Sequence, residues 1–400
     1  MKTNNNFILG LDIGSNQIRA LVCEIDKNKE LFLKTYLSAN FKGLEKGRVT
    51  NKDELKNVLE DIIFKLTKKL LVRPNKVIVN IPLYKLNFSF RTGILSIKNQ
   101  DSIVTQFDKN KCIERAKNSF HLLNKQIMHV IPFNYKLDNK DLINPLNKKG
   151  NLLEVNTHLI SCDQENIHAF IDVLHELDLK VLGLVYDALG ISEIFIPFSN
   201  RKEGAFLMDF GARFCRINYF KNNLLASSLV IPIGGETINH DLKQCLNISL
   251  HEAERIKILY GNALVYQVNS EEMIEIMTNN KEHVKIKRQL LCQIIEARLN
   301  ELINLIKKRF PLIFENHPLF LTGKSSKLLG FDQFLAKKLK LKVITKMPEN
   351  VSRIIDQEDY LNALGLLVYG YKNKAYDFIS IPNNVTLLDK LKKMVGSSYV

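Results

Sequence analysis

The first eighty residues alternate between two hydrophobic periods. Phe7–Ile13 and Gln17–Ile25 are mainly apolar runs of strand length on either side of a short polar turn, and Leu31–Ser38 is a third such run. Residues 51–71 instead place Leu, Ile and Val three or four positions apart, which predicts a helix. Lys76–Ile81 is again an apolar run of strand length. The pattern predicts three strands, a helix and a further strand.

The same order begins again two hundred residues later. Strands are predicted over 204–209, 213–220 and 224–232, followed by a long helical region over 236–315 and a strand over 319–323. Three strands, a helix and a strand form the start of a ribonuclease-H-like unit. The predicted fold class is therefore α/β, with an actin/Hsp70-type two-lobed fold built from two ribonuclease-H-like units.

Residues 84–163 do not continue the first unit. Phe88–Ile97 alternates like an edge strand, Asp108–Leu123 has helical spacing, and Gln126–Tyr135 and Leu152–Cys162 are further strands. This segment is predicted to be an inserted small α/β subdomain.

Both repeats carry the same chemistry in the turn of their first hairpin. Asp12 is followed by Gly14, and Asp209 is followed by Gly211, each pair at the end of a buried strand. Glycine allows backbone N–H groups to approach a phosphate closely, and a carboxylate can hold a hydrated divalent cation. One such turn is ordinary hairpin chemistry, but two copies that each open one half of the chain predict two phosphate hairpins acting on one nucleotide.

Composition narrows the class of protein. The chain has 400 residues, 46% of them hydrophobic, and a net charge of +15. Its lysines are scattered and not interleaved with aromatic residues, so a specific nucleic-acid partner is not expected, whereas weak attraction to acidic lipids or partners is. The six cysteines have no paired spacing and indicate reduced thiols in a cytosolic protein. No signal peptide is predicted, and no run reaches the roughly 18 apolar residues of a spanning helix.

Several motifs together resemble FtsA, the actin-like family of bacterial cell-division proteins that tether FtsZ filaments to the membrane. The resemblance covers almost the whole chain. It rests on the following segments: Gly10–Ser15, Gly43–Gly47, His129–Pro132, Asn144–Pro145, Val155–Cys162, Asp209–Gly211, Val230–Ile238, Glu252–Lys257, Tyr260–Leu264, Leu321–Gly323 and Ala363–Leu367. The position of the insertion agrees with that family as well.

The resemblance implies a function and a set of partners. It implies ATP with Mg²⁺ in the cleft between the lobes, filaments in which the insertion contacts neighbouring subunits, and peripheral attachment to the cytoplasmic face of the cell membrane at the division septum. The implied partners are the C-terminal tail of FtsZ, other copies of the chain, an anionic membrane surface and other division proteins. Two alternatives stay open: the related actin-like protein of type IV pilus assembly, and a weak ATPase or kinase of the same fold.

The resemblance also assigns site residues. Asp12 and Asp209 are the predicted metal-side carboxylates. The predicted nucleotide contacts are Asp12, Gly14, Ser15, Asn16, Asp209, Gly211, Ala212, Arg213, Gly234, Gly235, Glu254, Lys257, Gly323, Lys324 and Ser325. Asp187 occupies the position of the residue that orients the attacking water, although an aspartate before Ala-Leu-Gly is equally suited to starting a helix.

Two of these loops depart from the family. The expected glycine-glycine-threonine after Gly211 is here Ala212-Arg213-Phe214, and Lys324-Ser325 replaces glycines after Gly323. Arg213 can pair with phosphate charge or fill the space of the phosphate. ATP binding is therefore expected, with hydrolysis weak or absent.

The predicted organisation has six parts. They are a first lobe (1–83 and 164–202), the inserted polymerisation subdomain (84–163), a second lobe (203–235 and 316–371), a helical subdomain (236–315), a linker (372–384) and a C-terminal amphipathic helix (385–397).

Two surfaces are expected to bind partners. FtsZ is expected on the helical subdomain, where Lys285–Arg288 and Lys307–Arg309 offer positive charge. The C-terminal helix is expected to lie in the membrane interface with apolar residues on one face and lysines beside it. Its predicted membrane contacts are Leu387, Leu388, Lys390, Leu391, Lys392, Met394 and Val395.

Overall fold

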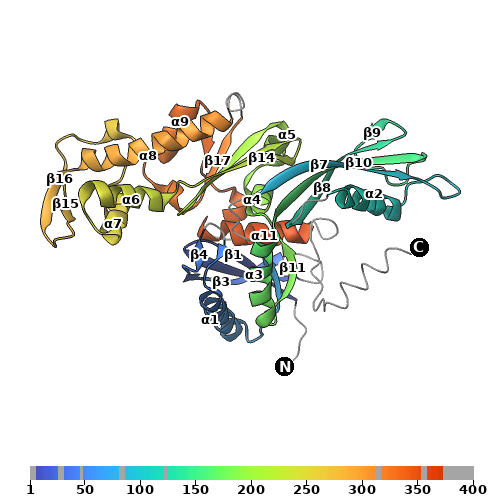
Figure 1. Ribbon diagram of the computed structural model, residues 1–400, viewed down its shortest axis with the longest axis horizontal. Helices are drawn as coiled ribbons and strands as arrows, with labels where there is room; N and C mark the ends of the chain where they lie inside the picture. Colours follow the sequence, from blue (N-terminus) through green and yellow to red (C-terminus); the bar gives the residue numbers. More distant parts are fainter. Residues whose placement is uncertain are drawn as a thin grey trace. The chain divides into compact units, whose positions relative to one another are not determined.

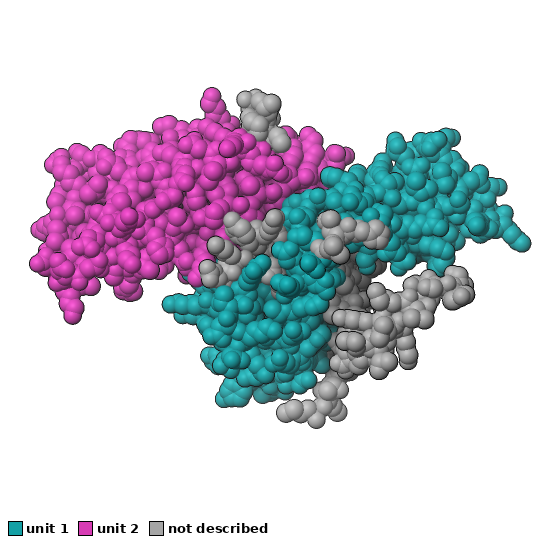
Figure 2. All heavy atoms as spheres, in the orientation of Figure 1, with its two compact units in different colours: residues 1–190, 362–400 teal, residues 191–361 magenta. Residues whose placement is uncertain are grey.

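The computed structural model describes residues 6–25, 31–45, 48–80, 86–120, 124–310, 317–352 and 358–372. The chain forms two compact units, distinguished by colour in Figure 2. Unit 1 contains residues 1–190 and 362–400, and unit 2 contains residues 191–361. Each unit is described by itself.

The central sheet of unit 1 has five strands in the order β11-β6-β1-β2-β3. The first three strands along the chain pair antiparallel, whereas β1, β6 and β11 run parallel to one another. The strands are β1 (Phe7–Ile13), β2 (Gln17–Ile25), β3 (Leu31–Asn40), β6 (Lys76–Val79) and β11 (Lys180–Leu184). This is the order of a ribonuclease-H-like unit.

Helices cover both faces of this sheet (Figure 1). On one face α1 (Lys52–Leu70) and α3 (Gln164–Glu176) bury their apolar stripes against the strands. The side chain of Asn51 caps α1 by accepting the Glu54 N–H at 2.9 Å. On the other face α11 (Leu361–Lys372) lies so close to β1 that a Cβ on Gly10 would be 2.7 Å from the Ala363 carbonyl oxygen.

The insertion forms a separate four-stranded sheet in the order β7-β10-β8-β9. Its strands are β7 (Asn87–Ser96), β8 (Lys125–Leu137), β9 (Lys140–Leu142) and β10 (Leu152–Asp163). Helix α2 (Gln106–Asn118) begins with a capping box between Thr105 and Asp108 and packs against β7. A Cβ on Gly93 would lie 2.0 Å from the Cys112 carbonyl oxygen, so this contact requires glycine.

The central sheet of unit 2 repeats the order of unit 1, as β14-β13-β12-β17-β18. Its strands are β12 (Ala205–Phe210), β13 (Cys215–Lys221), β14 (Leu224–Ile231), β17 (Leu319–Thr322) and β18 (Val343–Ile344). The first three are antiparallel and the last two are parallel to β12. The predicted fold class, an actin-like fold with two ribonuclease-H-like units and an inserted subdomain, is confirmed.

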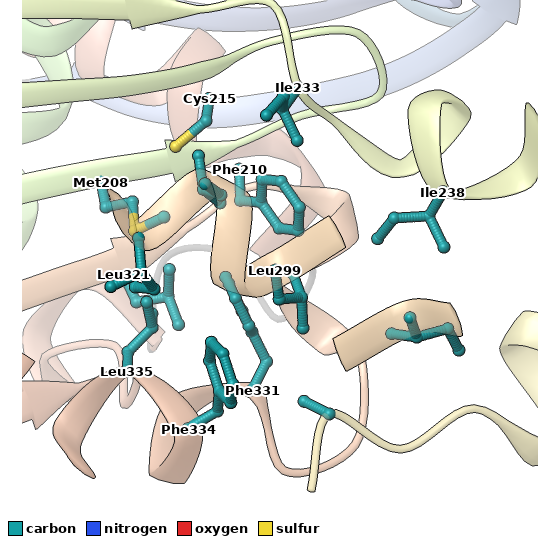
Figure 3. Packing of buried hydrophobic residues seen from close by; sticks show 14 of the residues in the cluster. Met208, Phe210, Cys215, Ile233, Ile238, Leu299, Leu321, Phe331, Phe334 and Leu335 are labelled. Atoms are coloured by element: carbon teal, nitrogen blue, oxygen red, sulfur yellow. The ribbon is translucent and has the colours of Figure 1, made fainter. Parts of the chain in front are cut away.

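Phenylalanine side chains pack among aliphatic residues in the unit 2 core (Figure 3). Phe210 from β12 stacks at a tilt on Phe331, with ring centroids 4.8 Å apart, and Phe334 follows one turn later on α9 (Phe331–Leu339). Met208 and Leu321 from neighbouring parallel strands join them. Since these side chains are fully or almost fully buried, they fix α9 against the strands that carry the site described below.

The segment predicted to be continuously helical, 236–315, differs from that prediction. It contains α6 (Gly235–Leu246), α7 (Leu250–Tyr260), the short helix η1 (Val265–Gln267) and α8 (Arg288–Arg309), but also a hairpin of β15 (Met273–Met277) and β16 (His283–Lys287). Residues of β15 are alternately exposed and buried, with Ile274 and Ile276 facing the core. This period of two is a strand pattern, and it lies inside an otherwise helical stretch.

The remaining elements are short or terminal. They are β4 (Leu44–Glu45), β5 (Arg48–Val49), α4 (Asp187–Phe195), α5 (Phe198–Glu203), η2 (Lys324–Lys327), α10 (Glu349–Ser352) and η3 (Glu358–Tyr360). The predicted linker beyond Lys372 and the predicted helix over 385–397 lie outside the described residues.

Candidate functional site

The turn between β1 and β2 is closed by one backbone hydrogen bond. The Gly14 N–H donates to the Gln17 carbonyl at 3.0 Å, so Ser15 and Asn16 form the tip of the turn. Asn16 is exposed and Ser15 is half-buried. Of the predicted phosphate contacts in this loop, Gly14 therefore shapes the turn, while the two tip residues present short polar side chains.

Asp12 precedes this turn and is almost completely buried, with 3% of its surface exposed. Its Oδ1 accepts a hydrogen bond from the Asn80 side-chain amide at 2.7 Å, and its Oδ2 lies 3.4 Å from the Arg19 guanidinium across the hairpin. The side-chain oxygen Oδ1 of Asn80 in turn accepts the Ile13 N–H at 2.7 Å. Asn80 thus fixes both the backbone and the carboxylate at the end of β1.

The turn between β12 and β13 has the same frame. The Gly211 N–H donates to the Phe214 carbonyl at 2.9 Å. Asp209 lies opposite Arg216 in the register, and the Arg216 guanidinium is 3.3 Å from Asp209 Oδ2. In both hairpins an arginine seven residues after the aspartate forms the same cross-strand ion pair.

The tip of the second turn packs against the start of α6. The Glu236 N–H donates to the Ala212 carbonyl at 2.8 Å, and the Glu236 carboxylate accepts from Arg213 Nε at 2.9 Å. A Cβ on Gly234 would lie 2.4 Å from the Ala212 carbonyl oxygen, so only glycine allows this approach. From the sequence, Arg213 could either pair with phosphate charge or fill the space of the phosphate. In the structure its guanidinium is paired with Glu236.

A second loop reaches the start of α6 in unit 2. Lys257 Nζ on α7 donates to the Gly235 carbonyl at 3.0 Å, and a Cβ on Gly235 would be 2.4 Å from the Ser325 hydroxyl. Gly323 has φ +99°, and a Cβ there would lie 2.5 Å from Asp209 Oδ1. The two loops after β12 and β17 and the N-terminus of α6 therefore meet at one place.

The electrostatics of Lys257 reflect this crowding. Burial lowers the pKa of Lys257, and the carboxylates of Glu254 and Glu236 oppose that shift. Glu254 and Lys324 are themselves exposed. The Lys257 ammonium lies beside the N-terminus of α6. An anionic ligand bound there would favour the protonated form of Lys257 and so oppose the effect of burial.

Asp187 is the first residue of α4 and is buried, with 6% of its surface exposed. Its Oδ1 accepts the Ala188 N–H at 2.8 Å, so the carboxylate lies at the N-terminus of α4, where a negative charge is favourable. This contact agrees with the structural alternative given for Asp187 above. The catalytic assignment of Asp187 stays a prediction.

Each unit thus gathers its own predicted residues. Unit 1 holds Asp12, Gly14, Ser15 and Asn16 on one hairpin, and unit 2 brings together Asp209, Gly211, Ala212, Arg213, Gly234, Gly235, Lys257, Gly323 and Ser325. The sequence reading missed Arg19, Asn80, Arg216 and Glu236. The two arginines could have been found from the sequence, because in both repeats an arginine follows the aspartate by seven residues.

The hairpins contain carboxylate oxygens, which are suitable ligands for Mg²⁺, but they lack the net negative charge of a Mg²⁺ site. Carboxylates are suitable ligands for Mg²⁺, usually through water. Here each aspartate already faces an arginine, so its negative charge is largely compensated where it stands. Within the described ranges, no group of three or more His, Cys, Asp or Glu side chains is arranged to hold a metal ion.

The basic residues expected to meet FtsZ are on β16 and α8 of unit 2. Arg288 is engaged with Glu272 at 2.9 Å and donates to the Tyr260 carbonyl at 2.8 Å. Lys285, Lys307 and Lys308 are exposed. Arg288 therefore supports the fold of this region, and the lysines carry its accessible charge.

No helix in the described part of the chain is long and apolar enough to cross a membrane. The residues predicted to contact the membrane, Leu387 to Val395, lie outside the described residues.

The family models and the curated relatives agree on one family. The family model described as "Cell division protein FtsA" matches residues 206–365, and that of the "SHS2 domain inserted in FTSA" matches residues 86–161. Together the two models match more than half of the chain. The second match falls on the insertion sheet β7-β10-β8-β9.

Curated relatives match over nearly their whole length. The cell division protein FtsA of Buchnera aphidicola subsp. Schizaphis graminum is 25% identical over 414 aligned residues, covering 99% of this chain and 98% of the relative. FtsA of Escherichia coli K12 is 24% identical over 400 residues, covering 96% of this chain and 95% of the relative.

Solved structures share the fold at low identity. A chain of the PilM-PilN type IV pilus biogenesis complex matches with a TM-score of 0.60 and 16% identity, covering 91% of this chain and 98% of that chain. MreB5 of Spiroplasma citri bound to ADP matches with a TM-score of 0.53 and 12% identity, covering 92% and 97%. These likenesses bear on the fold alone.

Proposed function

We propose that this chain, which belongs to the FtsA family of cell division proteins, is a nucleotide-binding adaptor that polymerises and holds FtsZ filaments at the inner face of the cytoplasmic membrane. The match of both the insertion and the second half of the chain to FtsA carries this proposal. It favours cell division over pilus assembly, since the insertion itself matches the FtsA form.

ATP is the proposed ligand of the two hairpins. The repeated frame, with a buried aspartate and a glycine-closed turn in each unit, supports a nucleotide ligand. On this proposal Ser15 and Asn16 face the phosphates from unit 1, and Gly211, Gly234 and Gly235 offer close backbone approach from unit 2.

The remaining nucleotide contacts are proposed on the loops around α7 and η2. Glu254 and Lys257 are assigned to the ribose and base, and Gly323, Lys324 and Ser325 to the adenosine loop. The Lys257–Gly235 hydrogen bond and the close approach of Ser325 to Gly235 support a compact pocket there. Arg213 stands beside the turn where the family has a small residue. We therefore propose that ATP binds and that its hydrolysis is weak or absent.

The insertion is the proposed contact between subunits of a filament. It has its own sheet and core, and it contributes none of the phosphate-hairpin residues. Its removal should abolish filaments on a lipid monolayer while sparing ATP binding. Filaments that persist without residues 84–163 would contradict this assignment.

FtsZ is proposed to dock on the region 236–315. Lys307 and Lys308 at the end of α8 are exposed and offer positive charge to a partly acidic tail, which mainly speeds association. Replacing both by glutamate should weaken FtsZ binding, and replacing the exposed Lys69 on α1 of unit 1 by glutamate is the control. Equal FtsZ affinity in the double variant and the wild type would rule out this surface.

The C-terminal segment is proposed as the membrane anchor. Burying five apolar side chains contributes about 1.5 kcal/mol each at best, and each lysine adds about 1 kcal/mol on anionic lipid. Ordering the helix costs around 1 kcal/mol per residue and nearly cancels these gains. One helix should therefore bind weakly, and a filament that carries many should bind firmly through avidity.

One experiment tests the adaptor function as a whole. Vesicles with anionic phospholipid are mixed with FtsZ, ATP and either the full chain or a chain ending at Asn383. The full chain should bring FtsZ down with the vesicles and the shortened chain should leave it in solution. Equal co-sedimentation of FtsZ with both chains, or with neither, would refute the proposal.

A further inference from the structure

We propose that the C-terminal segment of this chain, residues 385–397, docks on the uncovered face of the insertion sheet whenever it is not in contact with a membrane. The surface itself is argued from the insertion and α11 of unit 1. The consequence of docking, that the segment is withheld from lipid, rests on the proposed function of this segment as the membrane anchor.

The surface follows from the alternation of side chains along the strands of the insertion. Val155 and Leu159 of β10 belong to the core beneath α2, which packs against one face of the sheet (Figure 1). His158 therefore lies on the opposite face. Its register partners Phe90 on β7 and Ile131 on β8 lie on that same face, which we call the open face.

The open face carries large apolar side chains that are accessible to solvent. The exposed fractions are 58% for Phe90, 48% for Ile94 and 40% for Phe133, so no described residue covers this part of the sheet. The Phe90 ring stacks on His158 with centroids 4.9 Å apart and meets Phe133 edge to face at 5.8 Å. A contiguous apolar patch of this kind is typical of a contact surface.

Helix α11 brings the end of the chain to the open face. Tyr369, near the end of α11, lies edge to face against His129 with ring centroids 6.0 Å apart. His129 precedes Ile131 by two residues on β8, so both lie on the open face. Residues 373–384 connect α11 to the proposed docking segment. A connection of this length spans at most about 40 Å, which is more than the length of the sheet requires.

The dimensions of the segment and the face agree. Ile160 is opposite His129 in the register and Glu154 is opposite Ile94, so this stretch of β10 runs from the contact with α11 to the far end of the apolar patch. Six residues of a strand span about 20 Å. The helix predicted over 385–397 would have about the same length, because each helical residue rises about 1.5 Å.

The side chains of the segment also suit this face. Its apolar residues, predicted on one side of the helix, can cover the exposed phenylalanines. At the far end of the open face Glu154 and Asp141 are both register partners of Lys136, which leaves an excess of negative charge in this row. The segment has three lysines and one aspartate. Charge therefore favours this segment over a second copy of the open face, which would bring like-charged rows together.

Docking would change how the chain responds to a membrane. Only a free segment can enter lipid, so the apparent affinity of one chain falls by the fraction of time that its segment is free. A filament presents many segments to one membrane and gains avidity that a single chain lacks. The docked state would thus keep single chains in solution and leave membrane attachment to filaments.

The first experiment crosslinks cysteines in the full-length protein with a short bismaleimide. Cys245 is exposed and the other five cysteines are buried, so Cys245→Ser provides the background. Leu391→Cys in the segment is combined with Ile94→Cys on the open face. The matched control combines Leu391→Cys with Phe107→Cys on α2, which is also exposed but lies on the other face.

The rates of crosslinking within one chain distinguish a docked segment from a free one. A free segment reaches both sites, because the nineteen residues from Lys372 to Leu391 span up to about 65 Å. A docked segment holds its thiol beside the open face only. The Ile94→Cys pair should therefore react at least about tenfold faster than the Phe107→Cys pair.

The second experiment measures sedimentation with vesicles of phosphatidylglycerol and phosphatidylcholine. Phe90→Thr combined with Phe133→Thr removes the apolar contact and keeps residues that suit a strand. This variant should bind the vesicles at least about threefold more tightly than the wild type, because its segment is no longer held. The same two substitutions should change nothing in a chain ending at Asn383. Thermal unfolding checks that each variant is folded.

The outcomes separate this inference from the proposed function. Equal crosslinking rates at the two sites would overturn it and leave the open face to another protein, and crosslinks between two chains in place of one would assign the face to a second copy. Threonine substitutions that do not strengthen vesicle binding would also overturn it. Equal vesicle binding by the wild type and the chain ending at Asn383 would refute the membrane anchor, while the crosslinking rates would still decide whether the segment docks.

Discussion

Asn80 links the end of β6 to β1 in unit 1, and its replacement by alanine is the sharpest test of the first hairpin. The side chain accepts the Ile13 N–H and donates to Asp12, both at 2.7 Å. Its backbone N–H donates to the Leu11 carbonyl at 3.1 Å and is unaffected by the substitution. Asn80→Ala therefore removes two side-chain bonds and leaves the pairing of β6 with β1 intact.

The cost follows from the burial of the partners. Ile13 is completely buried and Asp12 is 3% exposed, so neither regains a full bond to bulk water. A buried N–H left without a partner costs roughly 1–3 kcal/mol, and a hydrogen bond to a carboxylate contributes about 1.5–3 kcal/mol. Because water can fill part of the vacated space, we expect a loss near the lower end, about 3 kcal/mol.

Hydrogen exchange of the β1 and β2 amides measures this loss for unit 1 alone. A global unfolding experiment would combine the signals of the two units. A change of about 3 kcal/mol lowers the protection factors roughly a hundredfold. Asn156→Ala is the matched control, because it removes an exposed bond from Thr92 on the insertion sheet and should change protection little. Protection in Asn80→Ala within about threefold of the wild type would refute the reasoning.

The other predictions concern packing and pH. Gly93→Val should detach α2 from β7 and lower the melting temperature, because the Cys112 carbonyl lies 2.0 Å from its Cβ position. Arg255 lowers the pKa of Glu252, so the stability from this pair is present above pH 4.5 and is lost as the pH falls through the folded pKa. Urea titrations at pH 7 and 3 should show a larger loss of stability in the wild type than in Glu252→Gln, which starts about 2 kcal/mol lower. Burial lowers the pKa of His158 from 6.5 to about 4, so the native state should lose up to about 3 kcal/mol as the pH falls across that window, and His158→Phe should remove this part of the dependence between pH 6.5 and 4.

The repeated architecture could be predicted because its strands are almost uniformly apolar. Every residue of β12 is buried, and six of the seven residues of β1 are, so the sequence shows continuous apolar runs ended by Asp-x-Gly turns. The hairpin of β15 and β16 was missed for the opposite reason. Its buried isoleucines alternate with exposed methionine and glutamate within a stretch dominated by helical spacing.

Only those candidate site residues that lie close together in the sequence could be predicted. Asp12 and Asp209 are marked by the turns that follow them, whereas Asn80 lies 68 residues after Asp12 and reaches it only because β6 pairs with β1. The partner of Arg213 could not be predicted either. Glu236 is 23 residues away, and the contact depends on where α6 begins relative to the turn.

The three ion pairs around the hairpins should respond differently to a bound phosphate. Arg213–Glu236 is partly exposed, with 28% and 32% of the side-chain surface accessible, and such pairs contribute at most about 1 kcal/mol. A phosphate can therefore take Arg213 from Glu236 at little cost. The pairs Arg19–Asp12 and Arg216–Asp209 are buried, and separating a buried pair leaves an uncompensated charge that costs roughly 3–5 kcal/mol. Each of these two pairs is therefore expected to stay intact when a ligand binds at its own hairpin, whereas Arg213 is expected to change its partner.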